Sequence, residues 1–112
     1  MIDFTKGWCK ETAHPAYQKF WSEANPSAGQ CLVTALVVQD LYGGDIYSCK
    51  VGRNSHFINM IADKIVDATA DQFGGMANIR YVSGSFKLRT RESLLKNKDV
   101  ADRYRILCER LQ

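Results

Sequence analysis

The chain has 112 residues, of which 46% are hydrophobic and 24% are charged, and its formal net charge at pH 7 is +3. This length predicts a single domain over residues 1–112, and the hydrophobic content excludes a disordered chain. No apolar run reaches the roughly eighteen residues of a membrane-spanning helix, and the first residues lack the basic-then-apolar order of a secretory signal, so we expect a cytoplasmic protein.

The positive charge is concentrated near the C-terminus. Residues 87–112 hold eight basic and four acidic side chains, a net charge of +4, so the first 86 residues sum to −1. The acidic residues are interleaved with the basic ones, and no aromatic residues alternate with them as a stacking surface for nucleic acid requires. This pattern is typical of a solvated helix face and disfavours nucleic acid as a partner.

Two short helices are predicted in the first part of the chain. Phe4, Trp8 and Thr12 lie at helical spacing, which predicts a first helix that ends before Pro15. A second helix is predicted from the apolar spacing of Tyr17, Phe20, Trp21 and Ala24. Pro26 ends it, because the residue before a proline is pushed out of the α region. The aromatic side chains expected in the core are Trp8, Phe20 and Trp21.

The strongest signal for secondary structure covers residues 27–44. Ser27 and Gln30 have the spacing of a capping box, with the serine as the N-cap. The segment 31–42 that follows is apolar on nearly every face, and two glycines after it supply a stop. We therefore expect a central helix that is buried on most sides.

After the glycines the apolar period changes to two, which predicts β-strands. The expected strands cover residues 46–51, 55–61, 65–69 and 79–82. Thr90 is predicted to cap a short helix through Leu95, and a last helix is predicted from about Asp99. The residues expected on its buried face are Val100, Tyr104, Leu107 and Leu111. Helices, an antiparallel meander and further helices together predict an α+β fold.

Cys31 falls in the first turn of the central helix, a position that favours a reactive thiol. Unpaired backbone N–H groups and the positive end of the helix dipole stabilise a thiolate there, and the same groups can receive an oxyanion. A cysteine nucleophile also needs a base within hydrogen-bond reach, and that base needs an orienting acceptor. His56 and Asp67 lie on neighbouring predicted strands, so we predict that Cys31, His56 and Asp67 are the catalytic residues.

The identity of the third catalytic residue depends on the strand register. If the turn consists of residues 63–64, Asp71 pairs with His56, while Asp67 faces Met60 on the same side of the sheet. A bulge or a shifted turn would bring Asp67 closer to the histidine. We predict Asp67 as the third member. The alternative third members are Asp71 and Asn59.

Other polar residues have weaker claims to a role. Gln30 and Asn25 are candidates for an oxyanion or substrate contact, and His14 is predicted to lie in a loop. The cysteines predicted to be structural are Cys9, Cys49 and Cys108. No two cysteines have the close spacing of a structural zinc site, and no phosphate-binding or dinucleotide motif occurs, so we expect neither a metal nor a cofactor.

The segments around these residues resemble a known family. Residues 25–31, 33–40, 55–59 and 66–73 look like the corresponding parts of the YunG-like family of small bacterial proteins. The order of a helix-borne cysteine, a strand-borne histidine and an aspartate on the next strand also resembles the papain-like superfamily, which includes transglutaminase-like proteins. This resemblance implies a minimal papain-like core with Cys31, His56 and Asp67 at the triad positions.

The function predicted from the sequence is that of a thiol hydrolase or acyl-transfer enzyme acting on an amide or thioester bond. Its partner would be a peptide, a protein or a small amide or thioester substrate. The alternative is a non-catalytic module on the same fold that binds a protein or peptide. Neither the residues nor the resemblance names the substrate.

Overall fold

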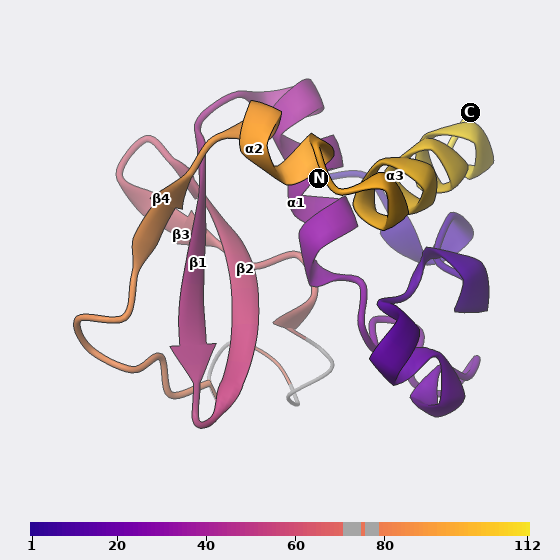
Figure 1. The fold of residues 1–112 in the computed structure, drawn as a ribbon, viewed down its shortest axis with the longest axis horizontal. Coiled ribbons are helices and arrows are strands. Elements are labelled where there is room, and N and C mark those ends of the chain that lie inside the picture. The colour runs from indigo at the N-terminus through magenta and orange to yellow at the C-terminus, as the bar shows by residue number, and fades with distance from the viewer. Residues whose placement is uncertain (71–74, 76–78) are drawn as a thin grey trace.

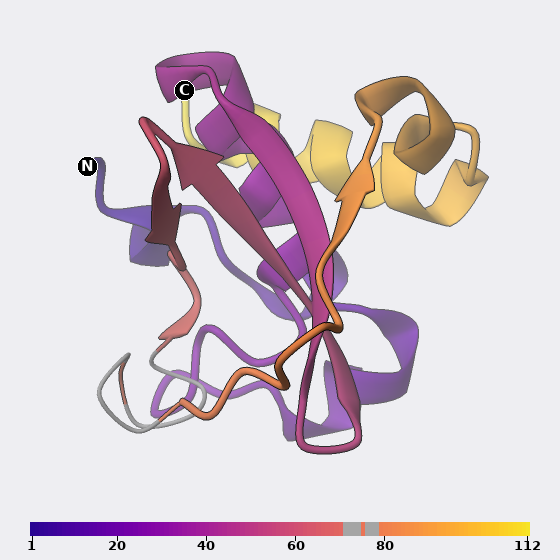
Figure 2. The ribbon, with the colours of Figure 1, turned by 90° about the vertical axis from the view of Figure 1, so that its left-hand side faces the viewer.

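The computed structural model describes residues 1–70, 75 and 79–112. Three 3-10 helices come first, followed by helix α1, strands β1–β4 and helices α2 and α3 (Figure 1). The strands pair in an antiparallel sheet with the order β3-β2-β1-β4. Figure 2 shows the sheet in front, with α1 crossing behind it and α3 beyond α1. The prediction of an α+β fold is confirmed.

The first part of the chain forms 3-10 turns where the sequence predicts longer helices. These turns are η1 (Phe4–Lys6), η2 (Lys10–Thr12) and η3 (Pro15–Phe20). The predicted burial of Trp8 is confirmed, and its indole N–H donates to Thr34 Oγ1 on α1 over 2.9 Å. The predicted burial of Phe20 is wrong, because this side chain is 56% exposed. Trp21 is half-buried. Tertiary contacts, such as the one between Trp8 and α1, hold this segment rather than helical periodicity.

Helix α1 (Cys31–Tyr42) has the predicted extent. It is followed by Gly43, whose φ of +74° is a conformation that residues with a side chain rarely adopt. The predicted capping box is wrong: Gln30 occupies the N-cap position and makes no side-chain cap bond. Its buried amide instead donates to the Cys9 carbonyl over 2.9 Å and accepts from Thr12 Oγ1 over 2.7 Å. These tertiary bonds satisfy the amide and fix the start of α1.

The sheet contains the two predicted hairpins and differs at its edges. Strands β1 (Asp45–Val51) and β2 (Asn54–Ile61) pair so that Cys49 lies opposite His56. Strand β3 (Lys64–Val66) is shorter than predicted. The predicted strand over residues 79–82 is wrong, since only an isolated bridge between Val51 and Tyr81 forms there. The edge strand β4 (Lys87–Arg89) was not predicted, because three exposed residues carry no apolar alternation.

The turn between β2 and β3 decides the register that the sequence leaves open. Ala62 and Asp63 both have positive φ, 51° and 62°, so the two-residue turn begins one residue earlier than expected. Ile61 pairs with Lys64, and the pairing moves by two residues relative to the expected one. Asp67 keeps its side of the sheet and comes closer to His56 than the expected register would place it.

The C-terminal helices follow the prediction. Helix α2 (Arg91–Leu95) is capped by Thr90, and helix α3 (Lys98–Arg110) buries Val100 and Leu107. Two buried clusters flank α1. The first comprises Phe4, Trp8, Val33, Val37, Val38 and Leu107. The second comprises Ala35, Leu36, Ile46 and Val100. Among the described residues, no helix has the length and apolar character to cross a membrane.

Helix α1 is expected to carry much of the stability because its side chains contribute to both clusters. Leu36 is 0% exposed, so we expect Leu36→Ala to lower the free energy of unfolding by about 2–5 kcal/mol. Leu88→Ala is the matched control: Leu88 is 58% exposed on β4, and its loss should change that free energy by less than about 0.5 kcal/mol. Urea unfolding followed by circular dichroism measures both. Equal losses would contradict the assignment of the core.

Candidate functional site

Cys31 is the first residue of α1 and is partly exposed at the wall of a pocket of about 370 Å³. Gly29, two residues earlier, has a φ of +71°, and a Cβ there would lie 2.9 Å from Tyr17 Cβ. Its carbonyl accepts from the His14 N–H over 2.9 Å. Residue 29 must therefore be a glycine, because its backbone has a positive φ and packs against Tyr17 of η3 just before α1 begins. The thiol stands at the positive end of the helix dipole.

His56 and Asp67 form a buried pair beside this thiol. His56 Nε2 lies 2.7 Å from Asp67 Oδ2, and both side chains are at most 1% exposed. Asp67 follows the last residue of β3 and is held by two further residues. Tyr81 Oη donates to Oδ2 over 2.7 Å, and the Thr69 N–H donates to Oδ1 over 3.3 Å. Both carboxylate oxygens thus have donors, which fixes the orientation of the aspartate.

The environment of His56 favours its charged form. Burial lowers the pKa of the imidazole, but hydrogen bonds with Asp67 and with Cys31, together with their negative charges, outweigh burial and raise it to about 9. Because Nε2 is bound to Asp67, Nδ1 is the nitrogen left to interact with the Cys31 sulfur. The arrangement supports a proton exchange between the thiol and a histidine that a carboxylate holds in one orientation.

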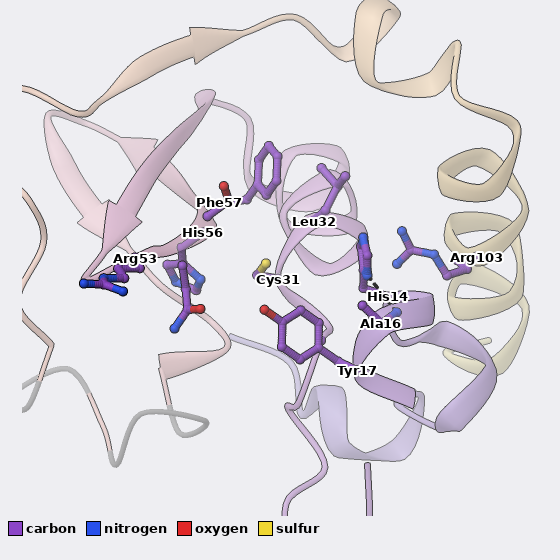
Figure 3. Close-up of a pocket in the computed structure, with 12 residues that line it drawn as sticks. His14, Ala16, Tyr17, Cys31, Leu32, Arg53, His56, Phe57 and Arg103 are labelled. Carbon is purple, nitrogen blue, oxygen red and sulfur yellow. Dashed lines mark hydrogen bonds between the residues drawn. The ribbon is translucent and has the colours of Figure 1, made fainter. Parts of the chain in front are cut away.

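The pocket lies between η3, the start of α1, the β1–β2 turn and α3. Figure 3 shows Cys31 near its centre, with His56 on one side and the Tyr17 ring turned toward the sulfur. Leu32 and Phe57 supply apolar walls. Two guanidinium groups also line the pocket, Arg53 from the β1–β2 turn and Arg103 from α3. The site therefore brings a thiol, an imidazole and positive charge together around an apolar space.

The other site candidates lie elsewhere. Gln30 is buried under η2, and Asn25 is exposed in the loop before α1, and neither lines the pocket. Asn59 is buried and donates from Nδ2 to the Ala35 carbonyl over 2.9 Å, so its amide binds the backbone of α1. Asp71 falls outside the residues that the structure describes. His14, predicted in a loop, caps η3 by accepting from the Ala16 N–H.

Cys49 is the cysteine that the sheet brings nearest to His56 in register. It is buried, and burial, followed by the negative charges of Asp67 and Cys31, raises the pKa of its thiol to about 11. A thiol in that state is a poor nucleophile near neutral pH. Over the described residues, no group of three or more His, Cys, Asp or Glu side chains has the arrangement of a metal site.

Two contributors to the site were missed from the sequence. The predicted strand over residues 79–82 includes Tyr81, and nothing in its local pattern shows that its hydroxyl meets Asp67, since that contact depends on the bridge to Val51. The charge pattern predicts a solvated helix face that includes Arg103, yet Arg103 is 3% exposed. Its position between Val100 and Leu107 on the apolar side of α3 is the signal that would have indicated burial.

The fold and the site define an α+β protein in which a helix-borne thiol lies beside a buried histidine–aspartate pair. The chain belongs to the YunG family: the family described as "YunG protein" matches residues 3–112. A protein of Bacillus subtilis (strain 168), "Uncharacterized protein YunG", is 42% identical over 65 residues, which are 58% of this chain and 56% of that protein. The aligned part thus spans about half of that relative. No solved structure matches the chain.

The raised pKa of His56 links folding to pH. The folded state keeps a proton on His56 up to about pH 9, whereas the unfolded chain loses it near 6.5. This stabilisation is therefore complete below pH 6.5 and is lost as the pH rises to about 9. We expect the free energy of unfolding to fall by about 3 kcal/mol across that window. Urea unfolding at several pH values measures it.

Two histidine variants test the assignment of this pH dependence. His56→Asn should remove the fall between pH 6.5 and 9. His14→Asn should retain it, because burial, followed by the positive charge of Arg103, lowers the pKa of His14 and moves its titration below this window. Parallel curves for the wild type and His56→Asn would show that another group is responsible.

Proposed function

We propose that this protein is a thiol hydrolase or acyl-transfer enzyme in which Cys31 is the nucleophile, His56 the acid–base and Asp67 the residue that orients the imidazole. The observation that carries the proposal is the 2.7 Å contact between two fully buried groups, His56 and Asp67, beside a thiol at a helix N-terminus. Burying such a pair is costly unless it is fully hydrogen-bonded, and its placement beside a nucleophile is typical of catalytic sites.

The chemistry follows from the positions of these atoms. The charged His56 ring already holds the proton of the Cys31 thiol, so the Cys31 thiolate attacks the carbonyl carbon of an amide or thioester. The backbone N–H groups of the first turn of α1 stabilise the oxyanion that forms. The imidazolium then gives its proton to the leaving amine or thiol as the carbon–heteroatom bond breaks. Water, or another acceptor nucleophile, releases the acyl group from the sulfur by the same steps.

Asp67 and Tyr81 serve this cycle without touching the substrate. The Asp67 carboxylate accepts the Nε2 proton of His56, which leaves Nδ1 as the acceptor in the neutral ring and stabilises the charged ring after proton transfer. Tyr81 donates to the same carboxylate oxygen and limits its movement. Tyr81 is therefore a positioning residue.

The papain-like superfamily is the proposed structural class for this site. Its members share the chain order of a cysteine at a helix start, a histidine on a strand and a polar residue that orients the histidine. The order Cys31, His56, Asp67 agrees with it. We propose a cytoplasmic setting because the four cysteines are free thiols, as a reducing compartment would keep them. The substrate would be a peptide, a protein or a small amide or thioester.

Selective labelling tests the nucleophile. We expect iodoacetamide to alkylate Cys31 at least about tenfold faster than Cys108 at pH 7, because Cys31, unlike Cys108, has both a helix N-terminus and a neighbouring imidazole. Peptide mapping by mass spectrometry after timed quenching gives the rate at each thiol. Cys108 is the internal control, since it is also partly exposed. In His56→Ala, the rate at Cys31 should fall to that of Cys108.

Equal rates at the two thiols in the wild type would remove the basis for an enzyme. That outcome would favour the alternative, a non-catalytic module in which the same pocket binds a peptide or protein. Binding of a partner by wild type and Cys31→Ala alike would then be expected.

Replacement of Asp67 tests the orienting role. Asp67→Asn removes the charge that holds the imidazolium, so the pKa of His56 should fall and alkylation of Cys31 should slow by about tenfold or more. The matched control is Asp63→Asn, in the exposed β2–β3 turn, where asparagine tolerates the positive φ of 62°. NMR titration of the His56 ring and the labelling rate give the two readouts. An unchanged His56 pKa in Asp67→Asn would contradict the pairing.

A further inference from the structure

Arg103 is a buried cation whose role the reaction above does not explain. It lies on α3, is 3% exposed, and lines the same pocket as Cys31. Its Nε donates to Asp99 Oδ2 over 2.8 Å, and its Nη1 donates to the Thr12 carbonyl over 3.3 Å. Asp99 is itself about half exposed, with a side-chain exposure of 48%, so it screens the guanidinium only in part.

The remaining nitrogen of Arg103, Nη2, makes no hydrogen bond within the described ranges 1–70, 75 and 79–112, and it is open to solvent. Figure 3 shows the guanidinium reaching from α3 toward the His14 ring at the edge of the pocket. A guanidinium has five N–H donors, so a solvent-accessible Nη2 can exchange water for an acceptor on a bound ligand. The geometry leaves room for an acceptor that enters with a ligand.

His14 adds a second donor on the same side. Its Nδ1 accepts from the Ala16 N–H over 3.0 Å, so the proton of the neutral ring is on Nε2. Burial, followed by the positive charge of Arg103, lowers the pKa of His14 and keeps the ring neutral. An N–H donor thus stands near a guanidinium, an arrangement suited to an anionic oxygen group.

The charge of the pocket wall agrees with this reading. Its described lining includes Arg53 and Arg103 and no aspartate or glutamate. The buried end holds one arginine, already partly neutralised by Asp99, which suits a singly charged carboxylate better than a doubly charged phosphate. Between this end and Cys31, the apolar side chains Leu32 and Tyr17 can enclose a short carbon chain.

We infer that the substrate of the Cys31 site carries a carboxylate, and that the Arg103 guanidinium binds it from the α3 side of the pocket. This inference rests on the proposed function and narrows it to amides or thioesters that bear an acidic group near the bond that is cleaved. In a peptide the carboxylate belongs either to an acidic side chain or to the chain terminus. Both sources present the same group to Arg103.

Matched alkylating probes test the inference without knowledge of the substrate. The Cys31 thiolate displaces chloride from a chloroacetyl group and forms a thioether, so the second-order rate reports binding and reactivity together. One pair is N-chloroacetylglycine, with a terminal carboxylate, and neutral N-chloroacetylglycinamide. The other is the α-amide of N-chloroacetylglutamic acid, with a side-chain carboxylate, and its neutral glutamine counterpart. Mass spectrometry of the peptide containing Cys31 gives each rate.

In the wild type we expect the acidic probe of at least one pair to react about tenfold faster than its neutral partner, as a charge-assisted hydrogen bond implies. The pair that shows the preference identifies the source of the carboxylate. Ratios near one in both pairs, with Cys31 still faster than Cys108, overturn the inference and leave the proposed function standing. Slow labelling of Cys31 by all four probes would instead count against the proposed function.

Variants on α3 assign the preference to one side chain. Arg103→Gln should bring the ratio close to one, and Arg103→Lys should restore part of it. The control Arg105→Gln, on the exposed face of the same helix, should keep the wild-type ratio. If Arg103→Gln does not fold, the rate ratios of the wild type and of Arg103→Lys still decide whether Arg103 binds the carboxylate. Loss of the preference in Arg53→Gln but not in Arg103→Gln would overturn the assignment to Arg103.

Discussion

The hydrogen bond between His56 and Asp67 is the interaction on which the arrangement of the site depends. The pair is 2.7 Å apart and shielded from solvent, so each remaining polar atom around it must also be satisfied. Tyr81 and Thr69 donate to the carboxylate, and the imidazole interacts with Cys31. Three features of the fold place groups around this one pair. The β2–β3 turn and the early end of β3 position Asp67, and the bridge to Val51 positions Tyr81.

Helix α1 links the pair to the rest of the molecule. Its buried side chains join two apolar clusters, and its ends are tied by polar contacts. At the start, the amide of Gln30 binds η2. At the end, Asp40 accepts from Tyr104 and pairs with Arg91 over 2.7 Å. Movement of α1 would therefore disturb both clusters, which keeps the Cys31 thiol in a fixed position relative to the sheet.

Elements with strong local signals were predictable, and elements that exist through distant contacts were not. Residues 31–42 carry a long apolar run with a glycine stop, and α3 has a clear apolar stripe, so both helices were predicted within one or two residues. The 3-10 turns near the N-terminus are held by contacts such as that of Trp8 with Thr34, and β4 is held by pairing with β1. Neither type of contact leaves a local pattern.

The sequence by itself determined the α+β class, the central helix with Cys31 in its first turn, and the pairing of the strands that carry His56. These follow from local propensity, apolar period and capping residues, which act over a few positions of the chain. Only the tertiary structure decided that Asp67 meets His56, that Tyr81 supports it, and that Arg103 turns into the pocket. Each of these depends on a turn placed one residue earlier or on packing between distant segments. The free energies that separate one strand register or packing from another arise from contacts far apart in the chain, so no local pattern encodes them.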